Sequence, residues 1–165
     1  MPAPPVILNN TPLVAIWSLD QLTLLRDLYQ SVLIPPAVEA EFLAIDRVAR
    51  QRALKDASWI EVAPLANPRY ALTYTGLDGG EAEVLTLAVE REARLVVIDE
   101  RKGRRYARHL GLPLTGTLGI LLLAKEKGLV TAVGPLIERL QASGLYLASE
   151  LVERVLILAQ ERDPS

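Results

Sequence analysis

Short, mostly apolar runs alternate along the chain with longer segments in which apolar residues recur at helical spacing. The run Leu95–Ile98 is wholly apolar, as expected of a strand buried on both faces of a parallel sheet. The alternation of strands and helices predicts an α/β fold with a central, mostly parallel sheet covered on both faces. The predicted strands are residues 6–8, 32–34, 59–62, 95–98 and 112–114.

Helix-terminating residues give the bounds of the predicted helices. Thr11 followed by Pro12 is typical of an N-cap with proline in the first turn, and Gly128 is typical of a C-cap. The first predicted helix begins near Thr11. The others cover residues 36–57, 78–93, 100–109, 117–127, 133–143 and 147–161, and residues 67–76 are predicted to form a loop.

Composition narrows the chemistry that the chain can perform. With 165 residues, half of them apolar, the chain can build the core of one domain, residues 1–165. Its core is expected at about 5–128 and C-terminal helices at about 133–161. There is no cysteine, which excludes disulfides and thiolate chemistry, and a single histidine, His109. Any chemistry must therefore come mainly from carboxylates.

Charge and hydropathy bear on partners and location. The formal net charge is −2, whereas nonspecific nucleic-acid binders usually carry a basic excess. This argues against a pure binding module and is compatible with an enzyme that reaches phosphates through metal ions. No signal-peptide pattern opens the sequence, and the longest apolar stretch, near Gly119–Ala124, is too short to span a membrane. We therefore expect a cytoplasmic protein without membrane contacts.

Some carboxylates fall where apolar residues are expected. On the helix predicted from Pro36, Val38, Phe42, Ile45 and Ala49 form one stripe, and Glu41 falls with that stripe. Asp46, Arg47, Arg50 and Gln51 fall on the opposite side. Glu41 is therefore predicted to point inward.

Three further polar residues are predicted at the same end of the sheet as Glu41. Glu81 lies in the first turn of its helix and shares the direction of Leu85 and Ala88, which with Ala82 and Val89 form the predicted apolar face, whereas Leu87 falls on the outer side with Glu83. Asp99 follows the strongest strand directly, and Asn9 follows the first strand. Since the carboxyl ends of parallel strands meet at one edge, we expect these groups to converge there.

A cluster of acids calls for cations, because like charges raise one another's pKa. Mg²⁺ and Mn²⁺ prefer oxygen ligands, can activate water, and can stabilise the charge that develops in phosphodiester hydrolysis. Structural roles are open for each residue: Glu81 could complete a capping box with Asp78, Asp99 could cap the next helix, and Glu41 could pair with an arginine. Their joint placement favours a metal site.

Basic residues follow Asp99 directly. Arg101 and Lys102 are the best placed to contact phosphate, with Arg105 in the same helix, although a solvated helix face is the alternative. Tyr106, Ala107, Gly103 and Leu110 share the spacing of a core face. His109 is expected to be exposed or to cap the helix. Thr117 opens a later helix, either as its N-cap or as part of the site.

Five segments resemble, in order, the DUF3368 group of PIN domains, which are toxin-like nucleases. The resemblance covers nearly the whole chain, and its longest segment holds Asp99 and the Thr-Gly-Thr turn. The segments are VILNNTPL (6–13), PPAVEAEF (35–42), GGEAEVLTLA (79–88), VIDERKGRRYARHLGLPLTGTLG (97–119) and the helical tail over 124–144.

The resemblance implies a Rossmann-like α/β/α sandwich that cleaves single-stranded RNA with Mg²⁺ or Mn²⁺. It places Asn9, Glu41, Glu81 and Asp99 at the metal, the three acids being catalytic, with Glu83, Glu100 and Thr117 as further candidates. Pairing with an antitoxin protein and assembly into a homodimer or higher oligomer are expected from PIN relatives. Asn9 departs from the usual aspartate and removes one negative charge.

Two other functions are compatible with the sequence. The chain could be a catalytically weak or inactive PIN-fold module that binds nucleic acid or a partner, in which case Asn9 is the discriminating residue. Asp99 could instead accept a phosphoryl group, although no second acid follows the first strand.

Overall fold

A computed structural model describes residues 3–164; Met1, Pro2 and Ser165, the outermost residues of the predicted domain, lie outside the described residues. Five parallel strands form one sheet in the order β3-β2-β1-β4-β5. The predicted α/β fold with a central parallel sheet is therefore confirmed. The strands are β1 (Val6–Leu8), β2 (Val32–Ile34), β3 (Ile60–Val62), β4 (Leu95–Val97) and β5 (Leu114–Thr115).

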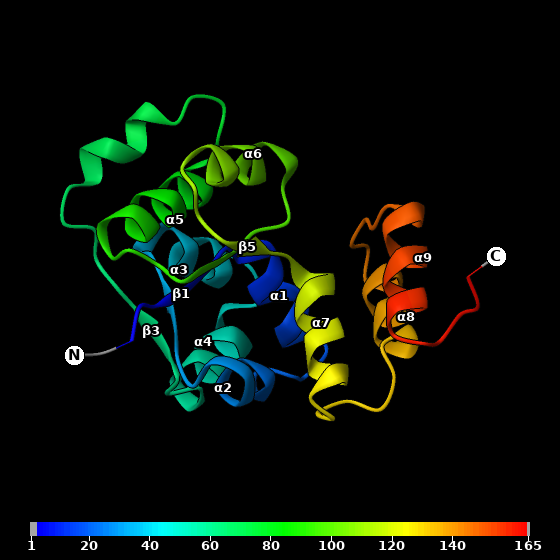
Figure 1. The fold of residues 1–165 in the computed structure, drawn as a ribbon. Coiled ribbons are helices and arrows are strands. Elements are labelled where there is room, and N and C mark those ends of the chain that lie inside the picture. The colour runs from blue at the N-terminus through cyan, green and yellow to red at the C-terminus, as the bar shows by residue number, and fades with distance from the viewer. Residues whose placement is uncertain (1–2, 165) are drawn as a thin grey trace.

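Helices cover the sheet on both sides (Figure 1). In this view α5 and α6 lie above the strands, and α2 and α4 lie below them. The helical hairpin of α8 and α9 packs beyond α7, so the two chain ends lie on opposite sides of the molecule. The helices are α1 (Asn10–Ser18), α2 (Thr23–Tyr29), α3 (Pro36–Leu43), α4 (Arg47–Asp56), α5 (Gly79–Glu90), α6 (Arg101–His109), α7 (Thr117–Glu126), α8 (Gly134–Ala142) and α9 (Ser149–Leu158), with the 3-10 helix η1 (Pro68–Thr73).

The central strands are buried because helices pack on both of their faces. Val6, Ile7 and Leu8 of β1 are all buried, as are the three residues of β2. Such strands need no alternation of polar and apolar residues, which is why continuous apolar runs marked them in the sequence. Within residues 3–164, no helix combines the length and apolarity needed to cross a membrane.

The helix predicted over 36–57 is wrong, because the structure contains two helices there. The chain leaves α3 after Leu43 and enters α4 through Asp46, whose φ of +49° is left-handed. Aspartate is among the few non-glycine residues that tolerate this conformation. The predicted apolar stripe is therefore broken: Ile45 is 66% exposed, whereas Arg50, predicted on the polar side, is 7% exposed.

Other element bounds differ by smaller amounts. The first helix begins at Asn10 rather than after a Thr11 cap, and α2 had not been predicted at all. The segment predicted as a loop over 67–76 contains η1, and the last strand begins two residues later than expected. Gly128 takes a left-handed φ of +75° after α7, as its C-cap role predicts.

Two helix faces are also corrected. On α5, Leu87 is buried although it was predicted on the outer side, and Val89 is exposed although it was predicted inside. Helices α3, η1 and α6 and strands β1 and β4 all contact α5, so more than one of its faces is covered. On α6, Gly103 and Ala107 are buried as predicted, whereas Leu110 is exposed.

Glu161 joins the end of α9 to the start of α8. Its carboxylate accepts hydrogen bonds from the backbone N–H groups of Val133 (2.8 Å) and Gly134 (2.9 Å) and from Lys125 Nζ (2.9 Å). Lys125 Nζ also donates to the carbonyl of Ala159. This set of bonds fixes the C-terminal hairpin against α7.

Candidate metal and nucleic-acid site

The two central strands place Asn9 and Asp99 at one edge of the sheet. Leu8 of β1 is in register with Val97 of β4, and the N–H of Asn9 donates to the carbonyl of Val97 at 2.9 Å. The chain continues from β1 to β2 and β3 on one side of this pair and from β4 to β5 on the other, so the strand order reverses between β1 and β4. Such a switch point is where open parallel sheets bind ligands.

Asn9 presents a buried oxygen to this edge. Its side chain is 3% exposed, and Asn9 stands at the N-cap position of α1 without making a side-chain capping bond. Within the described part of the chain, Oδ1 of Asn9 has no hydrogen-bond partner. A buried amide oxygen without a donor is costly, and a cation or a water in contact with it would remove that cost.

Glu41 reaches from the last turn of α3 to the start of α5. Its Oε1 accepts a hydrogen bond from the N–H of Gly80 at 2.9 Å. None of the ion pairs within residues 3–164 joins Glu41 to an arginine, the structural alternative for this residue. A Cβ at position 80 would lie only 2.5 Å from Oε1, so this approach requires glycine. Burial, followed by the charges of Asp78 and Glu83, raises the pKa of Glu41 above its usual value.

Glu83 makes the reciprocal contact between the same two helices. Its Oε1 accepts from the N–H of Ala37 in the first turn of α3, at 3.0 Å. A carboxylate at a helix N-terminus satisfies a free backbone N–H and interacts favourably with the helix dipole. Glu83 therefore holds α3 against α5, and Glu41 does the same in the opposite direction.

Glu81 is the most perturbed acid of the site. It is 7% exposed, and burial, followed by the charges and hydrogen bonding of Asp78 and the charges of Glu100 and Glu41, raises its pKa to about 7. Asp78 Oδ1 accepts from the Glu81 N–H at 2.8 Å, which supplies one half of the predicted capping box. No ion pair among residues 3–164 includes Glu81.

Asp99 is held separately from these acids by Thr117. Oδ1 accepts from the Thr117 N–H at 2.8 Å and Oδ2 from the Thr117 hydroxyl at 2.6 Å. Asp99 thus caps α7 and not α6, the helix that directly follows Asp99 in the chain. A Cβ at Gly116 would lie 2.5 Å from Oδ1, so glycine is required here as well. Thr117 is not an N-cap, since Gly116 has that position, and its hydroxyl is a partner of Asp99.

An arginine completes the surroundings of Asp99. Arg104 Nη1 donates to the carbonyl of Ile98 at 2.9 Å. Burial and the neighbouring charge of Arg108 lower the pKa of Arg104, and Asp99 opposes that effect. This part of the site therefore has a cation beside its carboxylate, whereas no ion pair between described residues includes Glu41 or Glu81.

The donor set suits a hard divalent cation. Among residues 3–164 no three His, Cys, Asp or Glu side chains lie close enough together to form a metal-binding group. Mg²⁺, however, is commonly bound through one or two carboxylates and keeps several waters. Glu41 and Glu81 could provide such a pair, and the unpartnered Oδ1 of Asn9 could supply a further oxygen.

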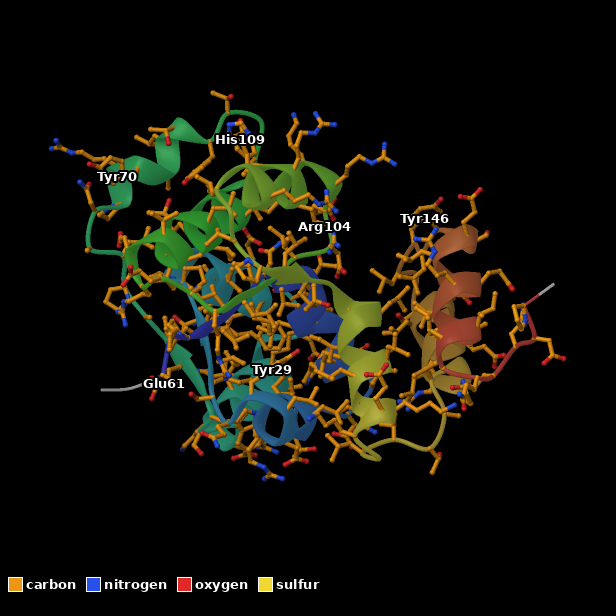
Figure 2. All side chains as sticks on the ribbon, in the orientation of Figure 1. Tyr29, Glu61, Tyr70, Arg104, His109 and Tyr146 are labelled. Carbon is orange, nitrogen blue, oxygen red and sulfur yellow. The ribbon has the colours of Figure 1, made fainter. Side chains whose placement is uncertain are left out.

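A groove of about 660 Å³ runs past Asp99, between α6 and the segment that joins α8 to α9. One wall carries guanidinium groups and the other carries apolar and aromatic side chains; Arg104 and Tyr146 lie on opposite sides of it in Figure 2. We call it the Asp99 groove; its lining includes Thr11, Asp99, Arg101, Arg104, Arg108 and Tyr146.

The structure changes the set of basic residues beside the acids. Arg101 lines the Asp99 groove as expected, together with Arg104 and Arg108. Lys102 instead packs over Gly76, since a Cβ there would clash with its side chain, and Arg105 is not part of the groove lining. The spacing of i, i+3 and i+7 in the sequence places the three arginines on one helix face and could have identified them.

A larger cavity, of about 690 Å³, lies away from these groups. Tyr29, Leu33, Glu61 and Arg94 line it near the start of β1, at the opposite ends of the strands (Figure 2). His109 is exposed at the end of α6, as expected. Asn9 and Asp99 therefore lie at the other end of the strands from this cavity.

A parallel α/β sheet with polar and acidic residues at the carboxyl ends of its central strands is typical of nuclease-like folds. The DUF3368 family model, described as PIN domain, matches residues 5–161, and the chain belongs to this family. No match was found among curated proteins. PIN domains generally use divalent metal ions and act on nucleic acid, in agreement with the oxygen donors and the groove described above.

Proposed function

We propose that the chain is a divalent-metal-dependent ribonuclease that cleaves single-stranded RNA, with Mg²⁺ or Mn²⁺ as its cofactor. The observation that carries the proposal is the buried Glu81 carboxyl, which faces Glu41, Asp78 and Glu100 without a basic partner among the described residues. Such an arrangement is stable as anions only with an added cation.

Each side chain has a distinct role in this proposal. Glu41 and Glu81 would hold the ion, and Asn9 Oδ1 would supply a neutral ligand. The ion would lower the pKa of a bound water and stabilise charge on the scissile phosphate. Asp99, fixed by Thr117, lies on the wall of the groove through which the strand would pass.

The groove supports a single-stranded substrate. Arg101, Arg104 and Arg108 can contact phosphates, which is the usual source of affinity for nucleic acid. Tyr146, 86% exposed on the opposite wall, offers a surface on which an unpaired base can stack. A duplex hides its base faces, so this combination favours unpaired RNA.

Cleavage of labelled single-stranded RNA tests the proposal. Glu81→Gln and Asp99→Asn should each lower the rate by about a hundredfold or more, because each removes a negative charge that would attract the metal ion to this edge of the sheet. Glu126→Gln is the matched control, since Glu126 is exposed at the end of α7. Undiminished cleavage by both site variants would refute the proposal.

A second function is favoured by Asn9 and by the engagement of Asp99. An asparagine in place of aspartate removes a charge, and both oxygens of Asp99 already bind Thr117. The alternative is a catalytically weak or inactive PIN-fold module that binds nucleic acid or a protein partner. It predicts weak Mn²⁺ binding and no cleavage by the wild type, with tighter Mn²⁺ binding in Asn9→Asp, as measured by calorimetry.

The wider biological role in this proposal comes from the family resemblance. It comprises a single PIN domain over the chain, a cytoplasmic location, a toxin role with an antitoxin protein as partner, and a homodimer or higher oligomer. Co-purification with the product of an adjacent gene and the mass of the native protein in solution would test the last two parts.

A further inference from the structure

Arg50, in the first half of α4, is a buried cation without an anion. It is 7% exposed, and none of the ion pairs between described residues includes it. The guanidinium carbon lies 4.7 Å from the ring centre of Trp17 and 5.0 Å from that of Phe42. Arg50 Nη1 donates to the carbonyl of Phe42 at 2.9 Å.

These contacts satisfy only part of the guanidinium. Aromatic faces and a carbonyl near the C-terminus of α3 favour a positive charge. However, a guanidinium has five N–H donors, and one of them has a described protein acceptor. Its Nε is buried and has no hydrogen-bond partner within residues 3–164. Buried charges are ordinarily paired, so the remaining donors indicate an anionic ligand.

Arg50 lines a groove of about 490 Å³ between α1 and the end of α8. We call it the Arg50 groove; its lining includes Asn10, Thr11, Trp17, Arg50, Ser143 and Leu145. The Oδ1 atom of Asn10 is also buried without a described partner. The site therefore combines a cationic fork with an unpaired acceptor, and it contains hydroxyl groups besides.

The Arg50 groove adjoins the Asp99 groove. Thr11 and Leu145 line both of them, so the two grooves share these residues. A polyanionic strand fits this arrangement, because phosphates repeat along it and each needs a cation. The guanidinium fork matches the geometry of a phosphate.

We propose that the Arg50 groove is a phosphate subsite, in which Arg50 binds a non-scissile phosphate of the strand that occupies the Asp99 groove. The subsite rests on the proposed nuclease function for its occupant. Thr11, which lines both grooves, would contact the sugar attached to that phosphate. The ligand is therefore a phosphate of an RNA chain.

Binding of inorganic phosphate tests the subsite without metal or turnover. The side-chain Nε–H signal of Arg50, assigned through its proximity to the Trp17 ring, should shift saturably during the titration. Ser143→Glu places a carboxylate in the groove and should abolish the shift, while Arg50 and its stacking are untouched. Gln141→Glu adds the same charge to an exposed position of α8 that does not line the groove, and should leave the shift intact.

Binding of a short, fluorescently labelled RNA in the presence of a chelator tests the occupant. Ser143→Glu should weaken binding about tenfold, and Gln141→Glu and the size control Ser143→Gln less than about twofold. Three results would overturn the subsite: no saturable shift with phosphate, equal loss in Ser143→Gln and Ser143→Glu, or acetate binding as tightly as phosphate, which indicates a carboxylate site. An intact phosphate shift in a chain that cleaves no RNA would refute only the nuclease proposal.

Discussion

Glu81 and Glu161 are both carboxylates beside a helix N-terminus, and their surroundings differ in almost every other respect. Glu161 accepts two backbone N–H groups at the start of α8 and the ammonium group of Lys125. Burial alone would raise its pKa, but these hydrogen bonds outweigh burial and hold the pKa below its usual value. Glu81 is surrounded by acids instead, and its pKa is raised to about 7.

The difference separates a structural carboxylate from a functional one. An acid whose pKa is lowered by folding stabilises the native state when it ionises, and an acid whose pKa is raised destabilises it. Glu161 therefore contributes stability at neutral pH, whereas the ionised Glu81 reduces it until a cation binds. Because both carboxylates belong to one chain, their opposite effects on the free energy of unfolding can be measured in the same protein.

The largest expected effect is loss of the Glu161 contacts. Glu161→Ala leaves two N–H groups and Lys125 without their acceptor and should lower the free energy of unfolding by about 2–3 kcal/mol. Urea unfolding measures it, with Glu138→Ala on the exposed face of α8 as the control. The stabilisation by Glu161 should vanish as pH falls through its lowered pKa. An equal loss in the two variants would show that the carboxylate does not hold the hairpin.

Glu81→Gln should have the opposite sign. Between the ordinary carboxyl pKa of 4.5 and the folded value of about 7, the folded state binds more protons than the unfolded one. The stability of the wild type should therefore fall as pH rises through this window and level off above it. At pH 8 the variant should be more stable by roughly 1–2 kcal/mol and lack this slope.

Unfolding curves across the same pH range, for the wild type, Glu81→Gln and Glu126→Gln, measure this effect. The exposed Glu126 should give the wild-type slope. A slope unchanged by Glu81→Gln would mean that Glu81 is already ionised in the folded state at acidic pH.

Added Mn²⁺ should remove the destabilising effect of the ionised Glu81 on the native state. A ligand that binds only the folded state raises the free energy of unfolding by about 1.4 kcal/mol at ten times its dissociation constant. Thermal unfolding at pH 8 should show this increase in the wild type and should not show it in Glu81→Gln. Equal stabilisation of both proteins would place the ion elsewhere.

The sequence predicted those parts of the site that depend on strand ends and helix phase. Asn9 and Asp99 follow continuous apolar strands, and parallel pairing alone brings them to one edge. The first turn of α5 was equally visible, because Asp78 accepts from the Glu81 N–H as a capping residue does. Local patterns of this kind predict the structure because they do not depend on residues that are distant in the sequence.

Contacts between distant segments could not be predicted in this way. The break at Asp46 involves no proline or glycine, so the helix pattern of the sequence is continuous there. The burial of Arg50 depends on its stacking against Trp17 and Phe42 in the folded chain. Thr117 meets Asp99 only because β5 pairs with β4. One wall of the Asp99 groove is formed by the segment between α8 and α9, whose position no local pattern specifies.

The smallest effect we expect tests how closely Glu41 is held beside Glu81. Alanine usually stabilises a helix relative to glycine by up to about 1 kcal/mol. At Gly79 no described atom would meet the new Cβ within 4 Å, so Gly79→Ala should be neutral or stabilising. At Gly80 the Cβ would lie 2.5 Å from Glu41 Oε1, so Gly80→Ala should lose about 1 kcal/mol as the carboxylate is displaced.

Urea unfolding and Mn²⁺ calorimetry on the two alanine variants separate the structural and functional roles of that contact. If Glu41 and Glu81 bind one ion together, displacing Glu41 should weaken Mn²⁺ binding in Gly80→Ala and leave it unchanged in Gly79→Ala. Lower stability with unaltered Mn²⁺ affinity would instead assign Glu41 to the class of Glu161, a carboxylate that joins two helices, and leave Glu81 to bind the ion without it.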